Sequence, residues 1–378
     1  MTLRSLLFAL AIALLAAHAL GVEHVTRLEN GKQRELAGRI EVEAEDGGVL
    51  LLTPDGALWP LPKEEIAARR SDAAVFAPLS HDQLAKQLAG ELPAGFKFHQ
   101  TKHYLIAYNT SPAYAQWVGA LYERLFTAFY NYWGQRGVEL HEPEFPLVAL
   151  VFENKASYAQ FARAEVGDAA QSMIGYYSLK TNRMVSYDLT GVEDLRVVGE
   201  RNTAARINVI LSQPGAERTV ATIVHEATHQ VAFNSGLQVR YADIPFWVSE
   251  GIAIYFETPD LSSSKGWRKI GGVNRVNLVN FRRLLKNREQ GLETLLSGDQ
   301  RFRDPAKAAD AYAEAWALTY FLLRTRGEDY VKYLQALAQY APLGEQSADE
   351  RLAEFKKHFG DDLPKLEAEF LRYMRGVN

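Results

Sequence analysis

The residue types that could do chemistry gather in one short segment, His225-Glu226-Ala227-Thr228-His229. The apolar residues around this segment recur at the spacing of a helix. Residues four apart lie on one face of a helix, so the imidazoles of His225 and His229 can point at one metal ion. Glu226 lies beside that face, where it can reach a water on the metal without ligating the metal itself. The segment predicts a metal site with a general base; the alternative is two core or surface histidines without a ligand role.

A catalytic zinc ion needs a third protein ligand and an open position for water. Glu250 follows His229 by 21 residues, in the segment Trp247-Val248-Ser249-Glu250-Gly251. That interval suits a helix ending at Asn234-Ser235-Gly236, a turn, and a second helix that starts after Pro245 and packs back on the first. We expect Glu250 to be the third ligand; the alternative is a charge at the start of a helix.

Glu257 lies seven residues after Glu250, on the same stripe of the predicted second helix. A carboxylate at this position can accept a hydrogen bond from the N–H of a ligating imidazole and so fix its tautomer. The alternative for Glu257 is an exposed carboxylate with no role in the site.

The motifs resemble those of the gluzincin zinc peptidases, which join the thermolysin-like enzymes and the zinc aminopeptidases. The resemblance rests on His-Glu-Ala-Thr-His at 225–229 and Trp-Val-Ser-Glu-Gly at 247–251, and it extends to Glu-Gly-x-x-x-Tyr-x-Glu at 250–257. Asn234, five residues after the second histidine, also matches a position that is often occupied in the aminopeptidase branch. More broadly, the chain looks like uncharacterised exported bacterial proteins grouped with the peptidase MA-like clan.

The resemblance implies an α+β domain of the gluzincin or thermolysin-like type, mostly helical around the active site. It implies one zinc ion per chain with three ligands, His225, His229 and Glu250. Glu226 would be the general base. Glu257 and Asn234 would hold the metal ligands in place without binding the metal themselves.

Two departures from these families bear on the activity. The aminopeptidases hold the free amine of the substrate with a Gly-x-Met-Glu-Asn segment before the zinc motif, and this sequence has none, which favours an endopeptidase. Thermolysin-like enzymes place an Asp four residues after the ligand Glu, where this chain has Ile254. That role must pass to Glu257 or to another residue. The metzincin pattern does not fit, because it requires Gly and His at the positions of Ala232 and Ser235.

The tetrahedral oxygen formed in peptide hydrolysis needs a hydrogen-bond donor, which a Tyr or His from a later helix commonly supplies in this clan. Tyr312 is the candidate by its interval of 62 residues from Glu250, and Tyr320 is the reserve. A core or surface role is the alternative for Tyr312, because the chain has 18 tyrosines. His103 is interpreted as a strand histidine and not as a ligand.

A frame of helices and strands must position these residues. Helical spacing predicts helices over 81–92, 111–136, 216–234 and 246–257, and helices dominate from 279 to the C-terminus. Short apolar runs predict strands over 103–108 and 146–152. A predicted hairpin over 176–187 precedes the zinc motif, as the substrate-binding edge strand does in gluzincins.

The N-terminal part has a different pattern. Arg4, an apolar run over 6–17 and Ala17-His18-Ala19 predict a secretory signal peptide over 1–19; an uncleaved membrane anchor is the alternative. Alternation of period two between Asp-Gly and Pro-Asp-Gly turns predicts a small β module over 20–70. We expect a linker at 71–79 and the peptidase domain over 80–378. The mature protein is expected to be exported, periplasmic or extracellular, without stable membrane insertion.

Charge and composition exclude several classes of protein. The chain of 378 residues carries 42 basic and 46 acidic residues with no long block of like charges, which argues against nucleic-acid binding. Cysteine is absent, which excludes disulfides, thiol catalysis and cysteine ligands for a metal. Any metal must therefore be held by His, Asp or Glu.

Together these features predict a secreted zinc metallopeptidase that hydrolyses a peptide or protein, with its oligomeric state open. Two other classes remain: a peptidase-like binding module without turnover, and a structural protein of the cell envelope. An intact Glu226 counts against the binding module, because a site without catalysis has no obvious use for it.

Overall fold

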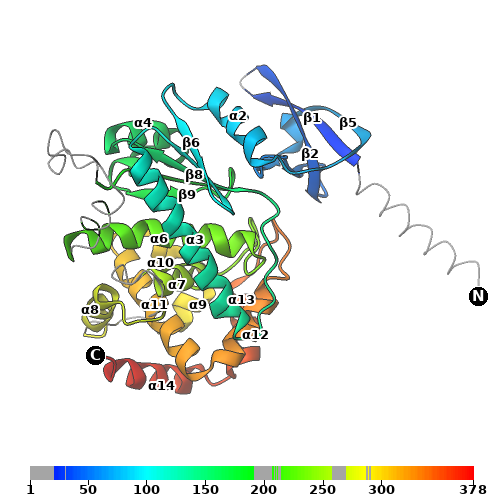
Figure 1. Ribbon diagram of the computed structural model, residues 1–378. Helices are drawn as coiled ribbons and strands as arrows, with labels where there is room; N and C mark the ends of the chain where they lie inside the picture. Colours follow the sequence, from blue (N-terminus) through cyan, green and yellow to red (C-terminus); the bar gives the residue numbers. More distant parts are fainter. Residues whose placement is uncertain are drawn as a thin grey trace, which may run out of the picture. The chain divides into compact units, whose positions relative to one another are not determined.

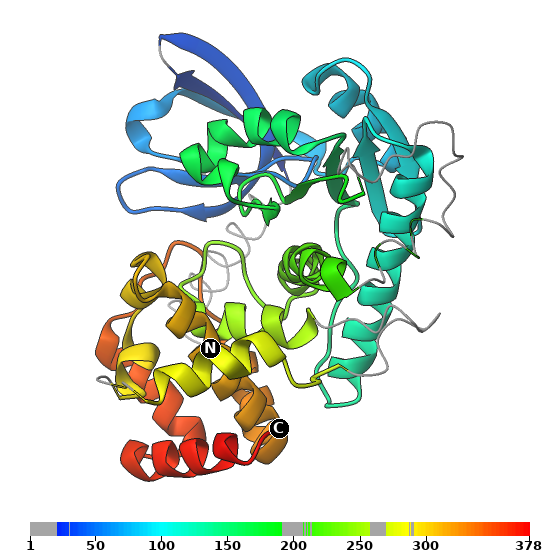
Figure 2. The same ribbon diagram turned by 90° about the vertical axis from the view of Figure 1, so that its left-hand side faces the viewer.

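The computed structural model describes residues 21–29, 31–190, 207, 209, 211, 214–257, 270–286, 288 and 291–378. The predicted signal peptide at 1–19 lies outside these residues. The chain forms two compact units, whose elements Figures 1 and 2 show from two sides. Unit 1 contains the chain up to Pro93 together with Glu144–Pro146 and Ser178–Asn182, and unit 2 contains Ala94–Pro143, Leu147–Tyr177 and Arg183–Asn378.

Unit 1 is built on an antiparallel sheet of five strands in the order β4-β3-β2-β1-β5. The strands are β1 (Gly21–Glu29), β2 (Lys32–Glu43), β3 (Val49–Leu52), β4 (Leu58–Leu61) and β5 (Ile66–Val75), with a 3-10 turn, η1 (Lys63–Glu65), before the last. The small core consists of buried aliphatic side chains: Val25, Leu36, Val49, Leu51 and Leu61. The predicted β module is therefore confirmed.

The predicted linker at 71–79 is wrong over its first half, because β5 continues to Val75. The strand pairs with β1 from Ile66 opposite Arg27 to Val75 opposite Gly21. Nine of its ten residues are exposed, so main-chain hydrogen bonds hold the strand and its sequence shows no alternation of apolar residues. For this reason the sequence carried no periodic signal for β5.

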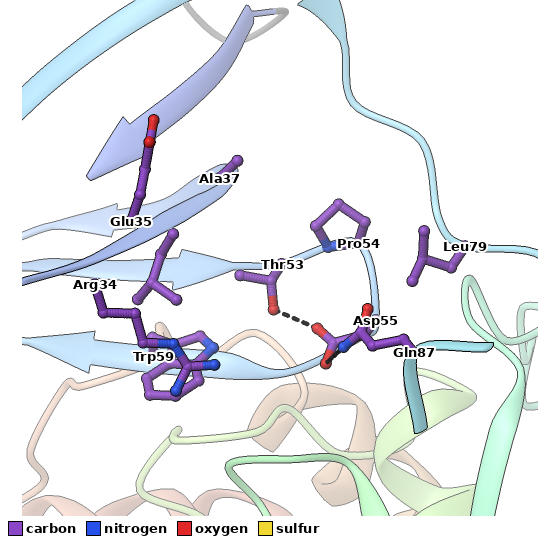
Figure 3. Close-up of a pocket in the computed structure, with 10 residues that line it drawn as sticks. Arg34, Glu35, Ala37, Thr53, Pro54, Asp55, Trp59, Leu79 and Gln87 are labelled. Carbon is purple, nitrogen blue, oxygen red and sulfur yellow. Dashed lines mark hydrogen bonds between the residues drawn. The ribbon is translucent and has the colours of Figure 1, made fainter. Parts of the chain in front are cut away.

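Unit 1 also includes α2 (His81–Glu91), which the sequence assigned to the second domain. The side-chain amide of Gln87 on this helix donates to Asp55 Oδ2 at 3.1 Å, and Asp55 Oδ1 accepts from the Thr53 hydroxyl at 2.5 Å (Figure 3). These residues line a pocket of about 220 Å³ beside Trp59 (Figure 3). The first unit therefore ends after α2, at Pro93, and not near residue 80.

Unit 2 begins with a mixed sheet of five strands in the order β6-β7-β8-β10-β9. They are β6 (Lys97–Gln100), β7 (Tyr104–Tyr108), β8 (Leu147–Phe152), β9 (Gly175–Tyr177) and β10 (Arg183–Tyr187). β8 runs parallel to both β7 and β10, while β9 pairs antiparallel with β10 and forms an edge of the sheet. The predicted strands and the predicted hairpin are confirmed.

Three helices cover the two faces of this sheet (Figure 1): α3 (Pro112–Gly134), α4 (Lys155–Val166) and α6 (Pro214–Asn234). One hydrophobic core joins α3 and α6 to alternate strand residues such as Ile106 and Ala149. On the opposite face, the ring of Phe152 packs against Phe161 of α4, with 4.9 Å between the ring centroids. A 3-10 turn, η2 (Gly167–Gln171), follows α4.

The rest of unit 2 is mostly helical (Figures 1 and 2). It comprises α7 (Phe246–Phe256), α8 (Arg275–Leu284), α9 (Glu293–Ser297), α10 (Gln300–Arg303), α11 (Ala308–Thr325), α12 (Gly327–Leu337), α13 (Ala348–Phe359) and α14 (Leu363–Arg375). α7 is central, because it packs against α6 and α11 and ten of its eleven residues are buried. The predicted α+β class with a β module in front is confirmed. Within the described ranges, no helix combines the length and apolarity needed to cross a membrane.

The close packing of α7 against α11 depends on Gly251. A Cβ atom at this position would lie 2.1 Å from the hydroxyl oxygen of Thr319 and 2.9 Å from the carbonyl oxygen of Ala315. Both neighbours are on α11, and a helical carbonyl cannot move away without a shift of the helix itself. Gly251 therefore sets how closely the helix that carries Glu250 approaches α11.

We expect Gly251→Ala to lower the free energy of unfolding by about 1–3 kcal/mol, the usual cost of an overpacked core. Thermal unfolding of the full chain measures the effect. Gly134→Ala is the control: an added Cβ there meets nothing within 4 Å, so the stability should stay unchanged or rise slightly. Equal unfolding temperatures for Gly251→Ala and the wild type would contradict this explanation.

Candidate metal centre

Three side chains that the sequence singled out converge between α6 and α7. His225 and His229 come from α6, and their Nε2 atoms are 3.2 Å apart. Glu250 comes from α7; its Oε2 lies 3.1 Å from His225 Nε2, and its Oε1 lies 3.4 Å from His229 Nε2. This group can hold a metal ion.

The separation between the two imidazole nitrogens fits a tetrahedral ion. Atoms about 2.0–2.1 Å from a zinc ion lie about 3.3 Å apart when they occupy two corners of a tetrahedron. The two imidazole nitrogens are 3.2 Å apart, close to that value; Glu250 offers His225 its Oε2 at 3.1 Å and His229 its Oε1 at 3.4 Å. Two imidazoles and one carboxylate are also a known donor set of catalytic zinc sites, in which water takes the fourth position.

The second ring nitrogen of His225 is held by a carboxylate. Its Nδ1–H donates to Glu257 Oε2 at 3.0 Å, and Glu257 Oε1 accepts from the side-chain amide of Asn274 at 2.6 Å. With the proton on Nδ1, His225 keeps the lone pair of Nε2 for a metal. The structure thus places Glu257, directly after α7, where the sequence predicted a hydrogen bond to a ligand.

A hydroxyl orients His229 in the same way. Its Nδ1 lies 3.3 Å from Ser249 Oγ, and that hydroxyl donates its own proton to Gln238 Oε1 at 3.0 Å. A hydroxyl has only one proton, so Ser249 accepts from the Nδ1–H of His229. Both histidines therefore direct Nε2 at the same point, where a metal ion would displace any proton that Nε2 shares with Glu250.

The charges of the ligands support one another. Burial by itself would raise the pKa of the Glu250 carboxyl, but His229 and His225 hold this pKa far below its usual range. Burial likewise disfavours the charged form of His225, but hydrogen bonds with Glu250 and Glu257 outweigh burial and raise the pKa of His225. Glu250 is therefore ionised, which is the form that ligates a metal.

Glu226 lies next to the ligands and is bonded to strand β9. Its Oε2 accepts the backbone N–H of Tyr177, the last residue of β9, at 2.9 Å. Burial raises the pKa of Glu226, and His225 and His229 oppose the shift without cancelling it. A buried carboxylate with a raised pKa beside a metal site has the properties of a general base.

Tyr312 lies within electrostatic range of the same carboxylates. Burial is the main cause of the raised pKa of its phenol, and the negative charges of Glu250 and Glu226 raise this pKa further. Tyr320, the reserve candidate two turns later on α11, packs its ring against Tyr255. Tyr312 thus feels the charges of the site, and its role as hydrogen-bond donor stays a prediction.

Two other residues that the sequence singled out lie beside the ligands. Asn234 ends α6; its amide donates to the Gln230 carbonyl at 2.7 Å, and its side chain hydrogen-bonds the phenol of Tyr177. These bonds connect Asn234 with β9, and its support of a metal ligand stays a prediction. His103 lies directly before β7, and its Nδ1 is 2.7 Å from Glu123 Oε2.

Three residues of the site were not found from the sequence: Gln238, Ser249 and Asn274. Ser249 lies directly before Glu250 in the motif at 247–251, so the sequence could have indicated it. Gln238 and Asn274 lie in or at the end of connecting segments, and no spacing rule relates them to the histidines. Ile254 is buried, and Glu257 supplies the carboxylate behind His225.

A known protein family matches the part of the chain that contains the candidate metal centre. Residues 219–344 match a family described as "Protein of unknown function (DUF1570)". The match includes most of α6 and all of α7 and α11, and so all three candidate ligands, Glu226 and Tyr312. A search of curated proteins finds no match for the chain. The candidate metal centre thus lies within the region that resembles this family.

We expect the purified protein to bind one divalent metal ion per chain, with zinc as the test ion, and His229→Ala to lose it. The substitution removes one ligand nitrogen and leaves the other two ligands in place. Metal analysis after equilibration with equal zinc measures the difference. His141→Ala, at an exposed histidine outside the group, is the control and should keep the metal. Equal zinc content in the wild type and His229→Ala would refute the site.

Proposed function

We propose that the protein is a zinc-dependent metallopeptidase of the gluzincin type that acts as an endopeptidase. The observation that carries the proposal is the convergence of two imidazole nitrogens and a carboxylate in a group that can hold a metal ion, with Glu226 next to His225 on the same helix. The sequence motifs support it, because they place the ligands on two consecutive helices, as in the gluzincins.

A zinc ion held by these ligands would supply a Lewis acid for the carbonyl of the scissile peptide bond. Glu226 takes a proton from the attacking water and passes it to the leaving amine. The raised pKa of Glu226 suits these two proton transfers, because the carboxyl must hold the proton between them. The N–H of Tyr177 fixes one oxygen of Glu226, and we assign the proton transfers to the other oxygen.

Tyr312 is assigned as the donor to the oxygen that gains negative charge. Burial and the two nearby carboxylates raise the pKa of its phenol, so the phenol stays protonated at neutral pH. A protonated phenol donates a hydrogen bond that strengthens as the charge develops in the transition state. The carboxylates themselves cannot supply this bond, because they only accept.

The proposed substrate class follows from the edge strand. β9 forms an edge of the sheet, and its last residue, Tyr177, is hydrogen-bonded to Glu226. An extended peptide can add to such an edge by main-chain hydrogen bonds, which would bring a peptide bond close to the base. Because the sequence lacks the amine-holding segment of the aminopeptidases, we propose internal bonds of a peptide or protein as the substrate.

The alternatives are a binding protein without turnover and a structural protein of the cell envelope. Neither uses a buried carboxylate of raised pKa next to three converging ligand atoms. We also propose that the protein is exported, periplasmic or extracellular, on the basis of the predicted signal peptide at 1–19. Such a location matches a hydrolase of peptides outside the cytoplasm.

We expect Glu226→Gln to lower kcat by on the order of 10²–10⁴, with zinc content and stability unchanged. Glutamine keeps the size of the side chain and an oxygen for the Tyr177 N–H, but it cannot take a proton. Rates are measured with N-blocked, internally quenched peptide libraries and with free-amine aminoacyl substrates at matched zinc content. Glu153→Gln, at an exposed position, is the control and should leave kcat unchanged.

Each outcome distinguishes one possibility. Cleavage of free-amine substrates alone would replace the endopeptidase with an aminopeptidase. A Glu226→Gln enzyme as active as the wild type would remove Glu226 as the base. A protein that binds zinc and cuts no member of a broad library would favour the binding protein.

We expect Tyr312→Phe to lower kcat by about 10²-fold or more with KM nearly unchanged, because an oxyanion donor acts in the transition state. The matched change Tyr320→Phe should alter neither constant, since that ring packs against Tyr255. Steady-state kinetics on the same peptide measures both variants. A loss with Tyr320→Phe and none with Tyr312→Phe would move the donor role to Tyr320.

A further inference from the structure

We propose that Phe302, on the one-turn helix α10, is a positioning residue that keeps the phenol of Tyr312 aimed at the metal centre. The proposal rests on the proposed function, in which Tyr312 donates to the developing oxyanion. It adds a residue that touches neither ligand nor substrate and acts only through the orientation of Tyr312.

The first support is a row of three aromatic rings. The ring of Phe302 lies edge-on to that of Tyr312, with 5.2 Å between centroids and 84° between planes. The same ring packs against Phe246, also at 5.2 Å between centroids. Phe246 is the first residue of α7, and Glu250 lies four residues on, on the same face of that helix. Phe302 therefore contacts both the helix that supplies Glu250 and the helix that supplies Tyr312.

The second support is the attachment of the start of α10 to α7. Asp299, directly before α10, accepts the backbone N–H of Phe246 on Oδ1 at 3.0 Å. Its Oδ2 accepts from Arg351 at 3.0 Å, and Arg351 also pairs with Asp243. Arg351 is buried and its bond with Asp299 is partly buried, while the bond from the Phe246 N–H is exposed. These bonds hold α10 against the first turn of the ligand helix.

The attachment of α10 to α11 is equally strong. Arg301, the neighbour of Phe302, forms an ion pair with Glu314 at 2.7 Å between Nη1 and Oε2. Glu314 is fully buried on α11, two residues after Tyr312, and Arg288 donates to its other oxygen at 2.6 Å. A buried carboxylate with two arginine partners resists separation, because any break leaves a charge unpaired. The backbone under Phe302 is therefore fixed relative to both helices.

A fixed ring at Phe302 restricts a side chain that would otherwise be free to turn. Tyr312 is only partly buried, and a tyrosine on a helix has more than one accessible χ1 rotamer. The edge-to-face contact with Phe302 favours the observed rotamer, in which the phenol is within electrostatic range of Glu250 and Glu226. Without the ring, only the fraction of molecules in that rotamer can stabilise the transition state.

The test is a double-mutant cycle of Phe302→Leu and Tyr312→Phe in the full-length, zinc-loaded protein. We expect Phe302→Leu to lower kcat by about two- to threefold, as the two or three χ1 rotamers become equally populated, with KM and zinc content unchanged. In the Tyr312→Phe background the same change should cost nothing further, because no phenol is left to aim. The same loss in both backgrounds would show a merely structural role and overturn the proposal.

Acetohydroxamic acid gives a readout that needs no substrate. As the hydroxamate anion it binds zinc through its oxygens, and a phenol aimed at the metal can donate to one of them. Its Kd is measured by isothermal titration calorimetry for the four proteins of the cycle. We expect the Kd to rise several-fold in Tyr312→Phe and in Phe302→Leu, and no further in the double variant.

Two more variants separate positioning from packing. Phe302→Tyr keeps the ring and should restore wild-type values, and Phe302→Met, which lacks a ring but fills most of the volume, serves if Phe302→Leu fails to fold. Phe359→Leu is the matched control: Phe359 on α13 is 6% exposed against 8% for Phe302. It should lower the stability without a change in kcat or in the Kd of acetohydroxamic acid.

The outcomes distinguish this proposal from the proposed function. If Tyr312→Phe alone changes neither kcat nor the Kd of acetohydroxamic acid, Tyr312 is not the donor and the role of Phe302 falls with it. If Tyr312→Phe has its effect but the two changes are additive, Tyr312 keeps its role and only the positioning by Phe302 is overturned. If the protein cuts no peptide, the Kd values of acetohydroxamic acid for the four proteins decide whether Phe302 positions Tyr312.

Discussion

The buried carboxylate of Glu250 is the constraint on which the rest of the structure depends. The residue is only 7% exposed, and an ionised carboxyl in such surroundings is stable only when it is paired. Pairing with both imidazoles requires α7 to lie so close to α6 that each carboxylate oxygen reaches a ring nitrogen. It also requires α7 to fit against α11 on its other side, which Gly251 permits and a larger residue would prevent. The site is therefore a property of three packed helices, and not of a loop.

Both imidazoles are fixed by hydrogen bonds that end outside the ligand helices. Asn274 accepts the N–H of Asn277 as the cap of α8 and donates its amide to Glu257, so the start of α8 is tied to the orientation of His225. Gln238, in the connection between α6 and α7, accepts a hydrogen bond from the hydroxyl of Ser249, and that hydroxyl fixes the orientation of His229. These groups set the tautomers, which prepares both Nε2 atoms for a metal.

The remaining groups of the site come from three other directions. The edge of the sheet supplies the N–H of Tyr177 to Glu226. α11 supplies Tyr312, and α10 supports its ring through Phe302. In the proposed function the two kinds of element have separate tasks: the helices hold the metal ligands, and the edge strand can pair with an extended peptide. A helical bundle alone would offer the ligands without that edge.

The sequence by itself determined the parts of this protein that depend on local interactions. The pair His225 and His229 was visible because a helix brings residues four apart to one face whatever surrounds it, and α7 was visible from its apolar run and preceding proline. Strand β5 was not visible in the sequence. Its exposed residues show no alternation of apolar and polar side chains, and only pairing with β1 makes them a strand. The contacts of Asn274 with Glu257, of Gln238 with Ser249 and of Phe302 with Tyr312 were decided by the tertiary structure alone. Each contact joins separate segments of the chain, and the separation of such segments is set by packing of the whole core, which no short-range spacing encodes.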